Sequence, residues 1–323
     1  MKEILMSRGA RTLVEVCGNV QPGEQVLIIS EPEMSRIAST LASAVYAAKA
    51  EPTIVIMPPR KSDGQEPPPP VAAAMRACDI FYSAVKVSIT HSQAVIDAVK
   101  SGSRGLVMSQ WTEDMMISGG IEADFKAVAP ICKAVAEAMA GAKQVRLTTP
   151  FGTDLVMSTE GRRANVMTCM VSKGQFSGVP NVEANTAPIE GSAEGVIVTD
   201  ASIPYAGIGL LREPVICKVE KGLIVSIEGG RQARDLEEIL RSKNDPNVYN
   251  IAEIGVGLNP KSVFSGIMME DEGVWGSVHI GIGTNLTVGG KVRAAIHYDL
   301  IVTKATVIAD GRTVLKDGEV CVK

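Results

Sequence analysis

The sequence predicts an α/β protein, with an N-terminal, mostly parallel α/β domain followed by a β-rich α+β domain. Two patterns carry this prediction. Up to residue 142, short β-branched runs alternate with segments whose apolar residues recur every three or four positions, which is typical of parallel α/β units. From residue 143 onward, paired strand patterns joined by tight turns replace them. We therefore expect two domains, 1–142 and 143–323.

Four parallel strands and the helices between them account for the first domain. Each expected strand is a short apolar run rich in β-branched residues. These strands are VLIIS at 26–30, TIVIMP at 53–58, DIFYSAV at 79–85 and RGLVMS at 104–109. Helices are expected over 33–50, 71–78 and 92–102, with a stiff proline-rich loop at 66–70. No GxGxxG follows the first strand, so this half carries no dinucleotide-binding fingerprint.

Hairpins and one clear helix, over 231–243, make up the expected second domain. A long helical pattern over 122–142 precedes it and should kink or break at Pro130, because proline removes a backbone donor and crowds the preceding turn. The turns that join the expected strand pairs fall at 150–152, 221–222, 310–311 and 317–318.

The composition narrows the choice of partners. A net charge of -4 and an aromatic share of 4% provide neither a basic stripe for phosphates nor a platform for bases, so no nucleic-acid partner is expected. No apolar run reaches the roughly 18 residues that cross a bilayer. Glu3 interrupts the apolar N-terminal segment, which argues against a signal peptide and for a cytoplasmic location. The cysteines lack paired spacing and are expected to be free thiols. A small molecule or a short peptide remains as the substrate.

Two of the three histidines lie in strand patterns, GSVHIGIG and AAIHYDLIV. In the second pattern, His297 and Asp299 are two residues apart, so both leave the same face of a strand. They are either neighbouring metal ligands or an imidazole oriented by a carboxylate. In the first pattern, Gly281 and Gly283 share the face of His279 and are expected to leave space for a substrate beside it.

Carboxylates also occur where strands usually place apolar residues. Glu183 and Glu253 are embedded in such segments, and burying either as an isolated ion would cost several kcal/mol, so each needs a cation or a proton. Glu272 lies in an acidic run that solvation also explains. The third histidine, His91, opens a helical pattern and is expected at the surface or as a cap. Ordinary salt bridges would explain single residues, but the concentration of donors in one domain favours a metal site.

Two histidines and three carboxylates suit a hard-to-borderline divalent ion. They suffice for two ions with a bridging carboxylate, an arrangement that polarises a carbonyl and supplies hydroxide. The candidate ligands are Glu183, Glu253, His279, His297 and Asp299. A pair of Zn, Co or Mn ions is the expected cofactor, and one Fe(II) held by two histidines and a carboxylate is the alternative.

Four blocks in this order, PNVEANTAPIEGSAEG, NIAEIGVGLN, EDEGVWGSVHIGIGTN and AAIHYD, resemble the thermophilic metallo-aminopeptidases aminopeptidase T and aminopeptidase S. The resemblance covers about residues 180–300. It implies a dinuclear site with all five ligands in place, which hydrolyses N-terminal peptide bonds, and a homodimer whose active sites open into a shared cavity. In this reading Glu272 is the free carboxylate that shuttles a proton. One departure is Leu286, where that family has a tyrosine.

A weaker resemblance is to the ring-cleaving 2,5-dihydroxypyridine dioxygenases, which use one Fe(II). The shared segments are SAEG at 192–195, EKGLI at 220–224, GGK at 289–291 and the His297-x-Asp299 pair. Those enzymes carry a histidine where this chain has Glu253, and they lack the equivalent of His279. The ligand pattern therefore favours a metallo-aminopeptidase-like hydrolase, with the dioxygenase and a non-catalytic metal-binding protein as alternatives.

Overall fold

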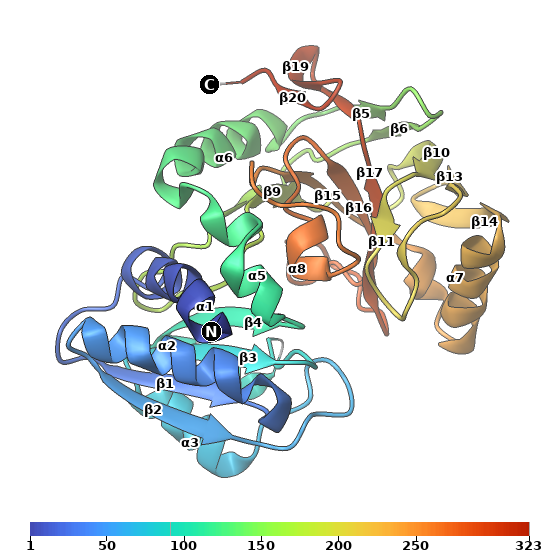
Figure 1. The fold of residues 1–323 in the computed structure, drawn as a ribbon. Helices are drawn as coiled ribbons and strands as arrows, with labels where there is room; N and C mark the ends of the chain where they lie inside the picture. Colours follow the sequence, from blue (N-terminus) through green and yellow to red (C-terminus); the bar gives the residue numbers. More distant parts are fainter. Residues whose placement is uncertain (91, 323) are drawn as a thin grey trace. The chain divides into compact units, whose positions relative to one another are not determined.

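The computed structural model describes residues 1–90 and 92–322, which form two compact units (Figure 1). The first unit comprises Met1–Phe125 and Met167–Pro180, and the second comprises Lys126–Val166 and Asn181–Lys323. A parallel α/β sheet in the first unit and antiparallel sheets in the second confirm the predicted fold class. The prediction for His91 lies outside the described residues.

A five-stranded parallel sheet, in the order β2-β1-β3-β4-β8, forms the centre of the first unit. Its strands are β1 (Gln25–Ser30), β2 (Glu51–Ile56), β3 (Ile80–Val85), β4 (Arg104–Ser109) and β8 (Phe176–Gly178). The first four coincide with the four predicted strands. The fifth, β8, comes from beyond the expected domain boundary and pairs with β4 from Gly105 to Val107. Because β8 has only three residues and no β-branched run, no strand pattern is recognisable there in the sequence.

Helices cover both faces of this sheet. On one face, α3 (Pro69–Ala77) and α4 (Gln93–Lys100) pack against a core that includes Leu27 and Phe81. On the other, the hydroxyl of Tyr82 donates to the carbonyl of Leu13, 3.1 Å away. The helical segments near that face are α1 (Lys2–Arg11), the π-helix Thr12–Cys17 and α2 (Ser35–Ala47). Shorter elements complete the unit: the 3-10 turns Pro32–Met34 and Gly120–Glu122, and α5 (Glu113–Ile117).

Two antiparallel sheets form the second unit. One has the order β14-β13-β10-β6-β5-β18-β19-β20, and the other has the order β12-β11-β17-β16-β15-β9-β7. The predicted hairpins β5–β6, β13–β14 and β18–β19–β20 are confirmed. The strands of the eight-stranded sheet are β5 (Val145–Thr148), β6 (Asp154–Met157), β10 (Glu194–Thr199), β13 (Val215–Glu220), β14 (Leu223–Gly229), β18 (Thr306–Ala309), β19 (Arg312–Lys316) and β20 (Glu319–Val320). Those of the seven-stranded sheet are β7 (Asn165–Met167), β9 (Glu183–Thr186), β11 (Ser202–Ile203), β12 (Gly209–Leu210), β15 (Ile251–Gly257), β16 (Val278–Gly283) and β17 (His297–Val302).

The helices of the second unit include one that differs from its prediction. Helix α6 (Phe125–Met139) runs without a break through Pro130 (Figure 1). The predicted break is therefore wrong, because burial of side chains such as Val135 and Met139 favours the helix although proline removes one backbone hydrogen bond. The alternative of a kink at Pro130 stays a prediction. The remaining helices are α7 (Arg231–Ser242), the 3-10 turn Pro246–Tyr249 and α8 (Met268–Asp271).

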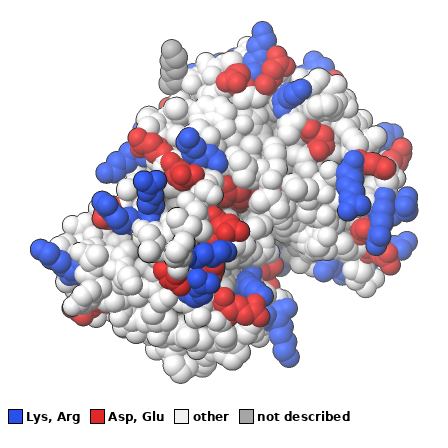
Figure 2. Space-filling view, viewed as in Figure 1, with Lys and Arg blue, Asp and Glu red and all other residues white. Residues whose placement is uncertain are grey.

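Charges of both signs are interspersed on the face of the molecule drawn in Figure 2. Ion pairs near the surface include Arg36 with Glu3 and with Glu113, at 3.0 Å each. Exposed pairs of this kind contribute about 0–1 kcal/mol each. Among the described residues, no helix is both long enough and apolar enough to span a bilayer.

The first unit is discontinuous in sequence, because its edge strand β8 lies after residue 142. The predicted division at 142 and 143 stays a prediction, since compactness alone does not test whether a segment folds by itself. A chain that ended at residue 142 would keep α6 but lose β8. It would also lose the hydrogen bond from the Trp111 indole to the carbonyl of Val179, which measures 2.7 Å.

We expect the fragment 1–142 to aggregate or to melt well below a matched fragment in which 1–125 is joined to 167–180 by a short glycine-serine linker. The reason is that loss of β8 turns the fully buried strand β4 into an unpaired edge. Sedimentation and thermal melting by circular dichroism would compare the two. A monomeric fragment 1–142 with the same melting temperature as the joined fragment would contradict this expectation.

Candidate metal centre

Five polar side chains share one face of the seven-stranded sheet, on four neighbouring strands. They are Glu183 on β9, Glu253 on β15, His279 on β16, and His297 and Asp299 on β17. The strand register brings them together: Glu253 and Asp299 are both paired with Gly281, and His279 is two residues from Gly281, on the same face. The intervening apolar residues point the other way, and Ile254, Ile280 and Leu300 are completely buried there. The alternation of polar and apolar residues along each strand thus sets the location of the site.

Glycines on neighbouring strands make room for these side chains. A Cβ atom on Gly255 would lie 1.9 Å from Nε2 of His279, so the imidazole occupies the space above this glycine. A Cβ on Gly281 would lie 2.7 Å from Cβ of Glu253 and 3.1 Å from Oδ1 of Asp299. The space beside His279 therefore comes from Gly255 rather than from the predicted Gly281 and Gly283. Gly281 instead opens space between Glu253 and Asp299.

The five side chains form two donor groups that share one carboxylate. The first is Glu183, Glu253 and His279, and the second is Glu253, His297 and Asp299; within each, the ligand atoms lie within 4.8 Å of one another. Oε1 of Glu253 is 3.8 Å from Nε2 of His279, and Oε2 is 3.0 Å from Nε2 of His297. Glu253 therefore presents a different oxygen to each group.

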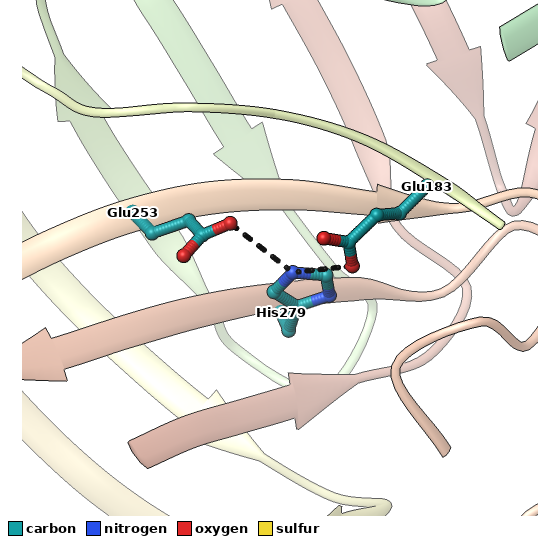
Figure 3. Close-up of side chains that lie close together, drawn as sticks. All are labelled: Glu183, Glu253 and His279. Atoms are coloured by element: carbon teal, nitrogen blue, oxygen red, sulfur yellow. Dashed lines mark ion pairs between the residues drawn. The ribbon is translucent and has the colours of Figure 1, made fainter. Parts of the chain in front are cut away.

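In the first group, the imidazole of His279 lies between two carboxylates (Figure 3). Its Nε2 is 3.3 Å from Oε2 of Glu183. Burial opposes a charged imidazole, but Glu183 and Glu253 outweigh it and raise the pKa of His279 to about 10. Burial also raises the pKa of Glu183 to about 7, although amides of Asn181 and Asn185 donate to its carboxylate at 3.1 and 2.6 Å. The two carboxylates therefore depend on a positive charge between them, which is either the protonated imidazole or a bound cation.

In the second group, His297 is held in a fixed orientation. Its Nδ1 lies 2.7 Å from the carbonyl of Thr284, which can only accept a hydrogen bond, so Nδ1 carries the hydrogen. Nε2 then faces Glu253 and Asp299, the second at 3.6 Å. Although burial opposes the cation, Asp299 and Glu253 hold the pKa of His297 well above its usual range. Burial opposes ionisation of Asp299, but the imidazoles keep its pKa below its ordinary value.

These residues fit a divalent metal ion. An imidazole whose Nδ1–H donates to a backbone carbonyl and whose Nε2 faces carboxylates is the usual arrangement of a metal-binding histidine. Two buried polar atoms in the cluster, Nδ1 of His279 and Oδ1 of Asp299, have no hydrogen-bond partner among the described residues. His297 is the most accessible of the five, with 26% of its side chain exposed. The second group therefore reaches solvent through His297.

Glu272 lies beside the cluster but belongs to neither donor group. The alternative that it is solvated is wrong, because its residue is only 7% exposed. Its carboxylate contacts the amide of Asn181 at 3.1 Å and the hydroxyl of Tyr205 at 2.7 Å. Burial, together with the charges of Asp299 and Glu183, raises the pKa of Glu272 well above its usual range. These surroundings favour the protonated form of Glu272, and its catalytic role stays a prediction.

Sequence reasoning did not find Tyr205 or Asn181. The hydroxyl of Tyr205 also lies 2.6 Å from Oδ2 of Asp299, and burial, Asp299 and Glu272 raise the pKa of this phenol well above its ordinary value. Tyr205 follows a strand of two residues in SIPYAGIG, so neither periodicity nor motif marked it. Leu286, which occupies the position where the aminopeptidases have a tyrosine, is 41% exposed.

Comparison with known proteins places the chain in a family. A family profile described as NicX, 2,5-dihydroxypyridine 5,6-dioxygenase, matches residues 7–322. The chain belongs to this family. A 2,5-dihydroxypyridine 5,6-dioxygenase of Pseudomonas putida KT2440 is 31% identical over 159 residues, which span 46% of this chain and 45% of that protein. The sequence match thus spans about half the length of this curated relative.

Two solved structures share the fold. The structure of the 2,5-dihydroxypyridine dioxygenase from P. putida KT2440 matches with a TM-score of 0.83 and 21% identity, covering 99% of this chain and 97% of the other. AmpT from Thermus thermophilus matches with a TM-score of 0.73 and 16% identity, covering 100% of both chains.

The family match overturns the prediction of an aminopeptidase T-like hydrolase, and with it the expectation of a peptidase and a peptide substrate. The four sequence blocks on which that prediction rested lie in and next to β9, β15, β16 and β17. Both structural neighbours match the whole of this chain, so these strands belong to the shared fold. The blocks therefore marked the sheet that carries the site and not the reaction performed there.

We expect Gly281→Ala to lower metal retention, because the added methyl would lie 2.9 Å from Cε1 of His297 and push the second donor group apart. Overpacking of this kind costs about 1–3 kcal/mol, and each 1.4 kcal/mol taken from binding weakens it about tenfold. Metal content after gel filtration, together with Co(II) titration, measures the effect.

The matched control is Gly230→Ala. Gly230 precedes α7 in the same unit, and the atoms nearest to its added Cβ would belong to the side chain of Glu213, which can move. We expect the control to retain the metal. A Gly281→Ala protein with the same metal content and Co(II) affinity as the wild type would show that Gly281 is not needed for the site.

Proposed function

We propose that this protein is an Fe(II)-dependent ring-cleaving dioxygenase that acts on a dihydroxypyridine-like aromatic substrate. The observation that carries the proposal is the NicX family match over residues 7–322, which includes all five donor residues. The convergence of Glu253, His297 and Asp299 on one side of a buried sheet supports it independently. Imidazole nitrogen suits iron, and this group differs from the usual iron triad in having one histidine and two carboxylates.

The second donor group would hold the iron. When bound, Fe(II) would supply the redox chemistry with dioxygen that opens the ring. Glu253 and Asp299 would offer carboxylate oxygens, and His297 would offer Nε2, oriented through the hydrogen bond of its Nδ1 to Thr284. Because His297 is the most accessible of the donors, a small aromatic substrate would approach from its side.

The residues around the donors would control charge and protons. Glu183, held by the amides of Asn181 and Asn185, would keep negative charge next to His279 and so keep that imidazole in place. Glu272 would keep a proton near the site, in contact with the hydroxyl of Tyr205. Glu183, His279 and Glu272 are buried, so water would be kept away from their side of the site, while the side of His297 stays accessible.

The chain departs from the expected dioxygenase pattern at Glu253 and His279. Both residues belong to the first donor group, which can hold a second cation through the other oxygen of Glu253. The metal count per chain is therefore part of the test. The homodimer stays a prediction and is tested separately by sedimentation at micromolar concentration.

We expect the protein, loaded anaerobically with Fe(II), to consume dioxygen when 2,5-dihydroxypyridine is added. The amount of dioxygen consumed should equal the amount of aromatic substrate lost, which is followed by its absorbance. His297→Ala should abolish this turnover, because it removes Nε2 from the donor group while the apolar face of β17 keeps its packing. An oxygen electrode and an absorbance trace measure both. Loading with redox-inactive Zn(II) is the control and should give no oxygen uptake.

Two results would contradict the proposal. One is the absence of oxygen uptake across a panel of dihydroxypyridines by a protein that holds iron and melts cooperatively. The other is hydrolysis of an aminoacyl anilide by the metal-loaded protein, which would bring back the peptidase that the family match overturns.

A further inference from the structure

Tyr205 is held in one orientation at the edge of the donor cluster. It follows β11, which pairs with β17 through Ser202 and Ile301, so the chain turns next to β17. The backbone N–H of Tyr205 donates to the carbonyl of Ile203, and the carbonyl of Tyr205 accepts from Ile208, at 2.8 and 3.0 Å. These bonds fix the backbone of the turn that carries the phenol.

The ring of Tyr205 is fixed as well. It stacks on the ring of Tyr298, with centroids 4.9 Å apart and an angle of 26° between the planes. Tyr298 lies between His297 and Asp299 on β17, so the stack ties the phenol to the strand that carries the second donor group. With backbone and ring both held, the hydroxyl has little freedom to leave Asp299.

The two oxygens of Asp299 have different surroundings. Oδ2 accepts a hydrogen bond of 2.6 Å from the hydroxyl of Tyr205. Oδ1 is buried, has no hydrogen bond among the described residues, and lies 3.6 Å from Nε2 of His297. It also lies 3.1 Å from the position that a Cβ on Gly281 would occupy, inside the donor group. One oxygen is therefore occupied, and the other is directed at the donors.

We propose that Tyr205 is a positioning residue that makes Asp299 bind the metal through Oδ1 alone. This inference rests on the metal centre of the proposed function. A carboxylate with both oxygens free can bind a metal through one or both of them, and binding through both takes up a coordination position. By holding Oδ2, Tyr205 keeps that position open for the substrate.

Glu272 supports Tyr205 from the other side. Oε1 of Glu272 lies 2.7 Å from the phenol oxygen. Because the single phenol hydrogen is donated to Asp299, Glu272 would be the donor in this second hydrogen bond. Oε2 of Glu272 accepts from the amide of Asn181, which also contacts Glu183, both at 3.1 Å. A continuous chain of hydrogen bonds therefore joins Asp299 of the second donor group to Glu183 of the first, and Tyr205 is the link that touches Asp299.

The test is Tyr205→Phe, which keeps the ring and its stacking on Tyr298 and removes only the hydroxyl. Wild-type and variant chains are loaded with Co(II), whose visible absorption reports coordination number. We expect the variant to bind Co(II) about 10- to 100-fold more weakly, the usual effect of losing a group that orients a ligand. We also expect weaker visible absorption from the bound ion, because Asp299 would then bind through both oxygens.

Tyr46→Phe is the matched control, since it removes the same hydroxyl from an exposed tyrosine on α2 in the first unit. It should leave the Co(II) affinity and spectrum unchanged, and circular dichroism melts should show both variants folded. A Tyr205→Phe protein with the affinity and spectrum of the wild type would overturn the proposal.

Co(II) binding and its spectrum do not depend on oxygen uptake. A failure of the dioxygenase assay with an altered Tyr205→Phe spectrum would therefore reject the reaction and keep the positioning role. Dioxygenase turnover together with an unaltered Tyr205→Phe spectrum would keep the reaction and reject the positioning role. A wild-type protein that binds neither Co(II) nor Fe(II) would overturn the metal centre and the role of Tyr205 together.

Discussion

The central constraint on the second unit is the burial of three carboxylates and the imidazole of His279, beside the partly exposed His297, on one face of a sheet. Buried charges are tolerated only when each has a partner, and removing one partner of a buried pair typically costs about 3–5 kcal/mol. The surroundings meet this requirement residue by residue. Glu183 has two amides, Glu253 has an imidazole at each oxygen, and Asp299 has a phenol at one oxygen. The carboxylates raise the pKa of both imidazoles, whose charge offsets part of theirs, and a divalent cation held by either donor group would replace that proton charge.

Much of the fold was predictable because short-range patterns determine it. The four β-branched runs of the first unit became four of its five parallel strands, and the tight turns of the second became its hairpins. The failures have physical causes. β8 has three residues and is defined by its partner β4, so its own sequence carries little signal. Pro130 suggested a break because local propensity ignores the buried contacts that hold α6 together.

The convergence of the five candidate donors was predictable for a different reason. A glutamate or histidine in a strand that otherwise alternates apolar residues is conspicuous, and all five donors that stood out in this way converge. Tyr205 and Asn181 were missed because their importance arises only from contacts with residues distant in sequence, 94 positions in the case of Tyr205 and Asp299. The reaction was assigned wrongly because the donor pattern reports which metals fit, whereas the substrate is determined by features that the strand motifs do not encode.

The discontinuous first unit also affects the order in which the protein can be completed during synthesis. Its sheet is closed at one edge by β8, which leaves the ribosome only after residues 126–166 of the second unit have been made. Domains of a growing chain generally fold from the N-terminus onward. Strand β4 therefore keeps an unpaired edge until residues 126–166 have been synthesised. The first unit cannot complete its sheet before synthesis of the second unit has begun.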